Sequence, residues 1–170
     1  MDIFVEQIIK KKFGTKDFLV FFGLILVGCV LIFASMLFIP SLSVIVLAAV
    51  CVGAYYLISS RNLEYEYSVT NGDITIDKII NRRSRKRVIS MDTHNIDAMG
   101  KYNPAEHSAK NYAARLTVSV TDDGKDAWYF TGSHPQKGSV LVVFSPNEKV
   151  LAAIKPFLAR QVSINAFGRN

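Results

Sequence analysis

Two long uncharged runs near the start of the chain constrain its fold more than any other feature. The first covers residues 18–39 and the second covers residues 42–59, with Pro40-Ser41 between them. As α-helices they would be about 33 Å and about 27 Å long, which is close to the thickness of a hydrocarbon core. Neither run has the polar face that a helix on the surface of a soluble domain shows. The sequence therefore predicts a transmembrane helical hairpin over residues 18–59, and the alternative is a pair of apolar helices inside a soluble core.

Charges on either side of the hairpin predict its orientation. The turn between the runs carries no charge, whereas four lysines precede the first run: Lys10, Lys11, Lys12 and Lys16. Short basic segments stay on the cytoplasmic side of a membrane. We therefore expect a multi-pass protein of the plasma (cell) membrane with both termini in the cytoplasm. The first run is longer than the apolar part of a signal peptide, and no cleavage-site pattern ends it.

Residues 1–17 form a separate N-terminal segment. Phe4, Val5, Ile8 and Ile9 recur at helical spacing, and lysines fill most of the positions that follow. This pattern predicts a short amphipathic helix that lies in the headgroup layer with its lysines toward anionic lipid; a helix packed on the soluble domain is the alternative. Two tyrosines near the end of the second run fit an aromatic belt. The predicted membrane-interface residues are Lys10, Lys11, Lys12, Tyr55 and Tyr56.

The composition of the two runs limits what the hairpin can do. Neither run contains Asp, Glu, Lys, Arg or His, which disfavours an ion or proton pathway. Ala49 and Gly53 form a small-xxx-small pair, which predicts close packing within the hairpin or a homo-oligomer formed through the same face. Cys29 and Cys51 lie near the middles of the two runs, and we interpret them as packing residues. A disulfide or a two-thiol metal site is the alternative.

Residues 60–162 are rich in β-strand patterns. Residues 63–69 alternate apolar and polar side chains, Asn71-Gly72-Asp73 is a hairpin turn signal, and residues 74–80 form the return strand. The further predicted strands are 87–91, 116–120, 127–131 and 140–144. A polar turn at 121–126 is expected to join two of these strands, 116–120 and 127–131, as a hairpin.

A helix closes the predicted domain. Ser145 is a good N-cap, and Glu148 completes a capping box three residues later. Apolar residues at helical spacing place Ile154 on the buried face, and the helix is predicted to run to about Gln161. Residues 163–170 are predicted to be a frayed tail.

Antiparallel strands followed by one C-terminal helix are the order of a pleckstrin-homology-like (PH-like) domain. Residues 65–76, with the sequence Tyr-Glu-Tyr-Ser-Val-Thr-Asn-Gly-Asp-Ile-Thr-Ile, are followed by a basic segment at 82–87. On these features and the double apolar run, the chain resembles bacterial membrane proteins in which a two-helix transmembrane hairpin precedes a cytosolic PH-like domain. The resemblance implies a membrane α-helical hairpin plus an α+β soluble domain, an antiparallel PH-like β-barrel or sandwich closed by a C-terminal helix. It implies no activity, because most such proteins have none assigned.

The candidate binding site is a basic cluster in the segment 82–87. Its charged residues are Arg82, Arg83, Arg85, Lys86 and Arg87. In a membrane-anchored protein such a cluster is expected to face the anionic headgroups of the inner leaflet; a specific anionic ligand and a merely solvated turn are the alternatives. Nucleic acid is not expected as a partner, because aromatic residues do not alternate with these charges.

Motifs for catalysis or metal binding are missing from the sequence. His94, His107 and His134 are far apart, match no zinc pattern and fall in predicted loops, where we expect them to be exposed. No nucleophile elbow or phosphate-binding glycine loop is present. We therefore predict no enzyme activity, no cofactor and no metal. The expected function is a membrane-anchored, non-enzymatic PH-like interaction module that binds a protein segment or an anionic lipid surface. The alternative is a structural or accessory subunit of a larger membrane assembly, with the hairpin as its interaction surface.

Overall fold

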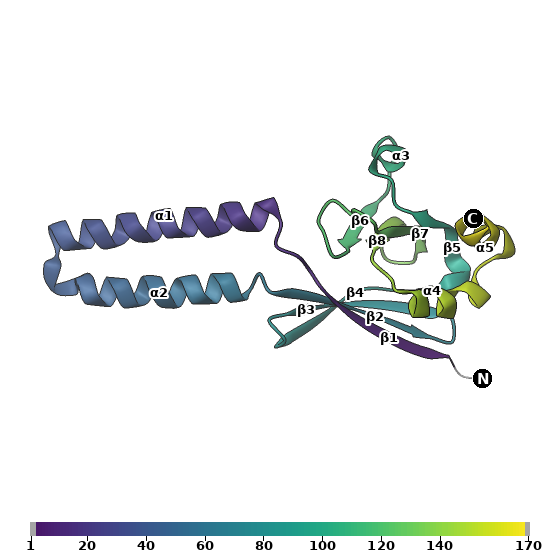
Figure 1. The fold of residues 1–170 in the computed structure, drawn as a ribbon, viewed down its shortest axis with the longest axis horizontal. Helices are drawn as coiled ribbons and strands as arrows, with labels where there is room; N and C mark the ends of the chain where they lie inside the picture. The colour runs from purple at the N-terminus through teal and green to yellow at the C-terminus, as the bar shows by residue number, and fades with distance from the viewer. Residues whose placement is uncertain (1–2, 169–170) are drawn as a thin grey trace. The chain divides into compact units, whose positions relative to one another are not determined.

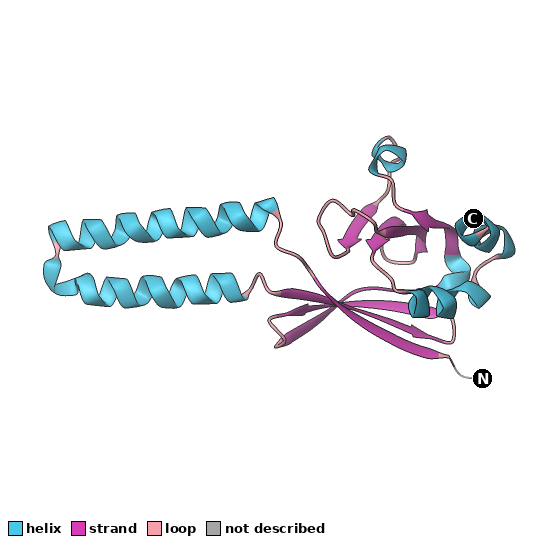
Figure 2. Ribbon diagram, in the orientation of Figure 1, coloured by secondary structure: helices cyan, strands magenta, loops and turns pink. Residues whose placement is uncertain are grey.

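The structure is a computed structural model that describes residues 3–168. The chain divides into two compact units: a helical unit of residues 13–63, and a second unit made of the chain before residue 13 together with the chain from residue 64 onward. Figures 1 and 2 show that the first unit contains only helices and turns, whereas the second contains all the strands.

The helical unit is a hairpin of α1 (Thr15–Phe38) and α2 (Ser43–Ser59), joined by a short 3₁₀ turn at Pro40–Leu42. The two helices pack on each other so closely that a Cβ atom at Gly28 would lie 2.9 Å from Cγ1 of Val50. The segments Asp17–Phe38 and Pro40–Ser59 have mean hydropathies of 2.8 and 2.2, and both are long and apolar enough to cross a membrane. Almost none of their residues are buried, which contradicts the alternative of a helix pair inside a soluble core.

The N-terminal segment is a strand and not the predicted amphipathic helix. β1 (Phe4–Lys10) pairs antiparallel with β2 (Leu63–Thr70), with Ile9 opposite Tyr65 and Lys10 opposite Glu64. The segment is a strand because it pairs with β2, in spite of the helical spacing of its apolar residues. Ile9 is buried whereas its neighbour Ile8 is exposed, as the alternation of side chains along a strand requires. The helical hairpin is therefore inserted between two neighbouring strands of one sheet, and the first strand belongs to the second unit.

The first sheet has the strand order β1-β2-β3-β4, with β3 (Asp73–Ile80) and β4 (Ser84–Asp92) completing it. The turn between β2 and β3 contains Asn71 and Gly72 with φ values of 47° and 96°, as a type I′ hairpin turn requires. This confirms the hairpin predicted from the Asn-Gly signal.

The second sheet has the order β5-β7-β8-β6. Its strands are β5 (Ile96–Lys101), β6 (Ala114–Val118), β7 (Trp128–His134) and β8 (Gly138–Phe144), and the short helix α3 (Pro104–Ser108) follows β5. The predicted hairpin of 116–120 with 127–131 is wrong, because β6 pairs with β8 while β7 pairs with β5 and β8. The pairing of β6 with β8 is parallel. The domain is therefore two packed sheets and not a closed antiparallel barrel.

The chain ends in two short helices instead of the one predicted. α4 (Glu148–Ile154) begins after Asn147, whose side chain accepts a hydrogen bond from the N–H of Val150, so Asn147 and not Ser145 is the N-cap. A 3₁₀ turn at Lys155–Phe157 contains Pro156 and ends α4. α5 (Arg160–Phe167) then covers β5 and buries Val162, so the prediction of a frayed tail is wrong for residues 163–167. Asn170 and its neighbour lie outside the described residues.

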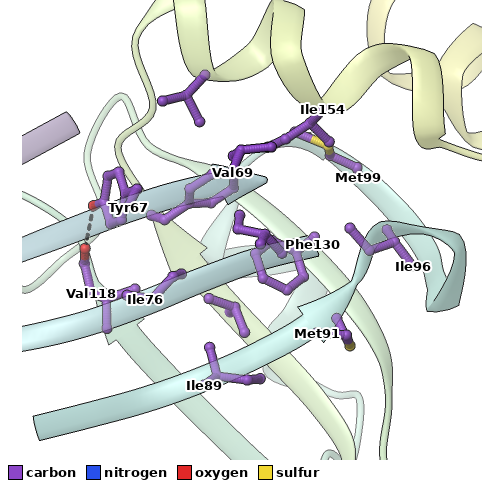
Figure 3. Packing of buried hydrophobic residues seen from close by; sticks show 14 of the residues in the cluster. Tyr67, Val69, Ile76, Ile89, Met91, Ile96, Met99, Val118, Phe130 and Ile154 are labelled. Carbon is purple, nitrogen blue, oxygen red and sulfur yellow. Dashed lines mark hydrogen bonds between the residues drawn. The ribbon is translucent and has the colours of Figure 1, made fainter. Parts of the chain in front are cut away.

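The core lies between the two sheets and under α4. Figure 3 shows Ile76 and Ile89 of the first sheet on the same side as Phe130 of the second, whereas Tyr67 points toward Val118; all five residues belong to one buried cluster. Ile154 of α4 is buried in the same cluster, as its position on the predicted helical stripe required.

Candidate functional site

The basic cluster begins at the turn between β3 and β4. Asn81 and Arg82 have φ values of 48° and 56°, and the N–H of Arg83 donates to the carbonyl of Ile80 at 3.0 Å. Only residues 81–83 form the turn, and β4 begins at Ser84, three residues before the predicted strand 87–91. Arg85 and Lys86 therefore lie on β4 together with Arg87. Because side chains alternate along a strand, Lys86 faces the opposite side of the sheet from its two arginine neighbours.

Three arginines of the cluster are held in ion pairs on the outer face of the first sheet. Nε of Arg82 lies 3.3 Å from Oε1 of Glu64, and Nε of Arg87 lies 3.2 Å from Oδ1 of Asp77. Arg85 reaches across β3 to Glu66 on β2. The side chains of the three acidic residues are only 5–12% exposed, whereas the arginines are more than half exposed. These arginines therefore cover and neutralise carboxylates of their own sheet, and little of their charge remains for a ligand.

Glu66 shows how closely the carboxylates are packed there. Burial raises the pKa of Glu66, and a hydrogen bond with Glu6 on β1 raises it further, while Arg85 acts in the opposite direction. Arg85 thus stabilises the charged form of Glu66, which burial disfavours.

Arg83 and Lys86 form no ion pair among residues 3–168. Lys86 lies directly opposite Lys78 in the β3–β4 register, on the side of the sheet that carries Ile76 and Ile89 further along. Like charges in directly opposite positions destabilise a sheet. Sequence reasoning missed Lys78, because it lies outside the basic run; folding the hairpin about residues 81–83 would have paired it with Lys86.

The predicted membrane-interface lysines lie at the same end of the first sheet as this turn. Lys10 ends β1 opposite Glu64, the residue that Arg82 contacts. Nζ of Lys11 forms an ion pair with Asp122 at 2.8 Å, whereas the side chain of Lys12 is exposed and its N–H donates to the carbonyl of Val120. We call Lys12, Lys78, Arg83 and Lys86 the basic end of the first sheet.

The two predicted interface tyrosines belong to the helical unit. Tyr55 and Tyr56 lie in the last part of α2, and both rings are exposed. At the open end of the same hairpin, Arg61 forms an ion pair with Asp17. Cys29 and Cys51 are free thiols exposed on α1 and α2, which excludes the alternative of a disulfide between them in this structure.

His107 is buried, contrary to the expectation of an exposed loop histidine. Its ring stacks on Tyr102, its centroid lies 4.2 Å from that of the steeply inclined Tyr129 ring, and Nδ1 lies 2.9 Å from the hydroxyl of Tyr112. Burial lowers its pKa, and the nearby Lys110 lowers it further. Nε2 is buried without a hydrogen-bond partner. The cage around it is aromatic, and no group of three His, Cys, Asp or Glu side chains that could hold a metal occurs among the described residues.

A broad groove of about 780 Å³ lies beside β5 and α5. Met99, Tyr102, Tyr129 and Val162 line part of it, and its acidic lining residues are Asp97 and Glu106. Its lining residues include no histidine, serine or cysteine that would pair as base and nucleophile.

Two packed sheets, C-terminal helices and an apolar hairpin define a PH-like domain with an inserted helical segment. Residues 1–164 match the bacterial PH-like domain family DUF6106, so the match includes β1, the helical hairpin and all the remaining strands. The chain belongs to this family. PH-like domains are in general non-enzymatic modules. No curated protein and no solved structure matches the sequence.

Proposed function

We propose that this protein is a membrane-anchored, non-enzymatic interaction module. In this proposal α1 and α2 cross the plasma membrane, and the PH-like domain binds a protein segment or an anionic lipid surface on the cytoplasmic side. The observation that carries it is the insertion of the apolar hairpin between β1 and β2, which are neighbouring strands of the same sheet.

The exposed surface of the hairpin supports the membrane part of the proposal. Large apolar side chains are exposed along both helices, from Phe18 to Ile58. Soluble monomers rarely expose contiguous apolar patches of more than a few hundred Å². A hydrocarbon environment stabilises such a surface, and the helix lengths match its thickness.

The connections support the anchoring part. Only residues 11–14 separate β1 from α1, and only residues 60–62 separate α2 from β2. An extended chain covers at most about 3.6 Å per residue, so each connection reaches no more than about 20 Å. Two short tethers at one end of a sheet restrain a domain much more than one flexible linker does.

Labelling of single cysteines in intact cells tests the proposal. Both native cysteines are first replaced by alanine, and a new cysteine is placed in the hairpin turn (Ser41→Cys) or in the exposed segment after α3 (Ala109→Cys). A membrane-impermeant maleimide should label position 41 from outside, and position 109 only after lysis. Labelling of position 109 in intact cells would refute the cytoplasmic placement, and recovery of the unlabelled protein in the soluble fraction would refute the anchoring.

The second candidate, a subunit of a larger membrane assembly, is favoured by one feature of the hairpin. Gly28 is used in packing between α1 and α2, whereas a Cβ atom at Gly53 or at Gly23 would meet nothing within 4 Å. These two positions leave room for another helix to approach. A stable oligomer in mild detergent that Gly53→Leu dissociates would support this role, whereas a monomer for both proteins would exclude assembly through this face.

A further inference from the structure

We infer that the basic end of the first sheet, Lys12, Lys78, Arg83 and Lys86, is a contact surface for the anionic headgroups of the membrane that the hairpin enters. This inference rests on the proposed membrane anchoring. Of the basic run 82–87, only Arg83 and Lys86 are included. Arg82, Arg85 and Arg87 are left out because they form ion pairs with carboxylates of their own sheet.

Within the described part of the chain, several basic side chains at this end of the sheet have no acidic partner. Four acidic side chains near this end have a basic partner: Glu64 has Arg82, Glu66 has Arg85, Asp77 has Arg87 and Asp122 has Lys11. The four residues of the basic end have no such partner among residues 3–168. Their positive charge is therefore uncompensated within the domain.

Lys78 lies directly opposite Lys86 on the neighbouring strand. Directly opposite residues on antiparallel strands have Cβ atoms about 4.5–5.5 Å apart, so their ammonium groups repel each other unless an anion lies between them. A phosphate or carboxylate group accepts hydrogen bonds from two ammonium groups at once and removes this repulsion. Arg83, at the tip of the same hairpin, adds a donor that suits phosphate.

The basic end adjoins the two points where the chain leaves and re-enters this unit. Lys12 directly precedes the helical unit, and the β3–β4 turn lies beside Glu64, where the chain returns from that unit. The chain therefore leaves and re-enters the domain at this end of the sheet. Attraction of a basic residue to an anionic leaflet falls off within a Debye length, about 10 Å at 0.1 M salt, so the proposed contact requires a basic surface at the end of the domain that the connections join.

Hydrogen exchange of the full-length protein in nanodiscs tests the inference. Exchange of the backbone amides in residues 78–87 is compared in discs of phosphatidylcholine alone and in discs that also contain phosphatidylglycerol. We expect slower exchange in the anionic discs, and loss of the difference at high salt. The double variant Lys78→Gln, Lys86→Gln should lose the difference, and the matched control Lys137→Gln, Lys149→Gln, which removes two exposed lysines elsewhere in the domain, should keep it.

Each other outcome has a distinct meaning. Equal exchange in the two lipids, with the hairpin inserted in the disc, would overturn the headgroup contact and leave the proposed anchoring intact. If the control variant also lost the difference in exchange between the two lipids, the headgroup contact would be overturned, because the change in net charge alone would explain the effect. Failure of the wild-type chain to enter nanodiscs would refute the anchoring itself.

Discussion

The hydroxyl of Tyr67 on β2 donates a hydrogen bond to the carbonyl of Val118 at the end of β6, at 2.5 Å (Figure 3). The same hydroxyl accepts a hydrogen bond from the N–H of Ser145, which follows β8. The side chain is completely buried, and burial raises its pKa, so it stays protonated and keeps its role as donor. Tyr67 of the first sheet thus links the ends of β6 and β8, the parallel pair of the second sheet.

Replacement of Tyr67 by Phe should therefore destabilise the domain. The change leaves the buried carbonyl of Val118 and the N–H of Ser145 without their partner, and we expect a loss of about 1–3 kcal/mol of unfolding free energy. Trp128, the single tryptophan of the chain, packs on Phe167 and reports unfolding of the domain by its fluorescence. Tyr55→Phe, at an exposed ring on α2, serves as the control and should leave the denaturant midpoint unchanged.

The strand assignment of the N-terminal segment predicts different effects at two neighbouring positions. Ile9→Ser should cost about 2–5 kcal/mol, because Ile9 is buried against the first sheet, whereas Ile8→Ser should have little effect. The measurement is denaturant unfolding of the full chain in detergent. Similar losses at both positions would contradict the register between β1 and β2.

Helix α4 offers a second comparison of neighbouring positions. Ile154 is completely buried and Leu151 only partly so. We expect Ile154→Ala to cost about 2–5 kcal/mol and Leu151→Ala to cost less, because a truncated side chain in a fully enclosed site leaves a larger cavity. An equal or larger cost at position 151 would show that α4 packs with a different face from the one described here.

The histidine in the aromatic cage predicts that stability depends on pH. Because the pKa of His107 is lowered in the folded protein, the unfolded chain binds more protons once the pH falls below about 6.5, so stability should fall as the medium becomes more acidic. The raised pKa of Glu66 acts in the opposite direction at lower pH, so the test compares wild type with His107→Phe. The difference in unfolding free energy between the two proteins should change between pH 7 and about pH 5.5. A constant difference would show that His107 binds a proton in the folded state as readily as in the unfolded one.

Local patterns predicted those elements whose partners are close in sequence. The β2–β3 hairpin follows from alternating side chains around Asn71-Gly72, and the two helices follow from the uncharged runs. The strand character of β1 does not follow, because its partner β2 comes only after the whole helical hairpin. For the same reason the sequence did not indicate the parallel pairing of β6 with β8, or the contact of the distant Tyr129 with His107 that helps to bury the histidine.

The candidate site was predicted only in part for a similar reason. A run of basic residues is visible in the sequence, but the carboxylates that neutralise Arg82, Arg85 and Arg87 come from β2 and β3. Which charges remain uncompensated depends on strand register and on the side of the sheet that each residue faces. Lys78 becomes a candidate only when its position opposite Lys86 is known.

The insertion of the hairpin between β1 and β2 also imposes an order on biogenesis. The ribosome completes the first strand before either helix, yet that strand has no edge to join until Glu64 and the residues after it have emerged. Throughout that interval the apolar helices are available to the insertion machinery while the sheet cannot close. Under the proposed membrane anchoring, and because pairing of distant segments is slow compared with helix formation, the domain should acquire its native sheet only after the helices have been delivered to the bilayer. A folded domain would then mark a molecule whose insertion is complete.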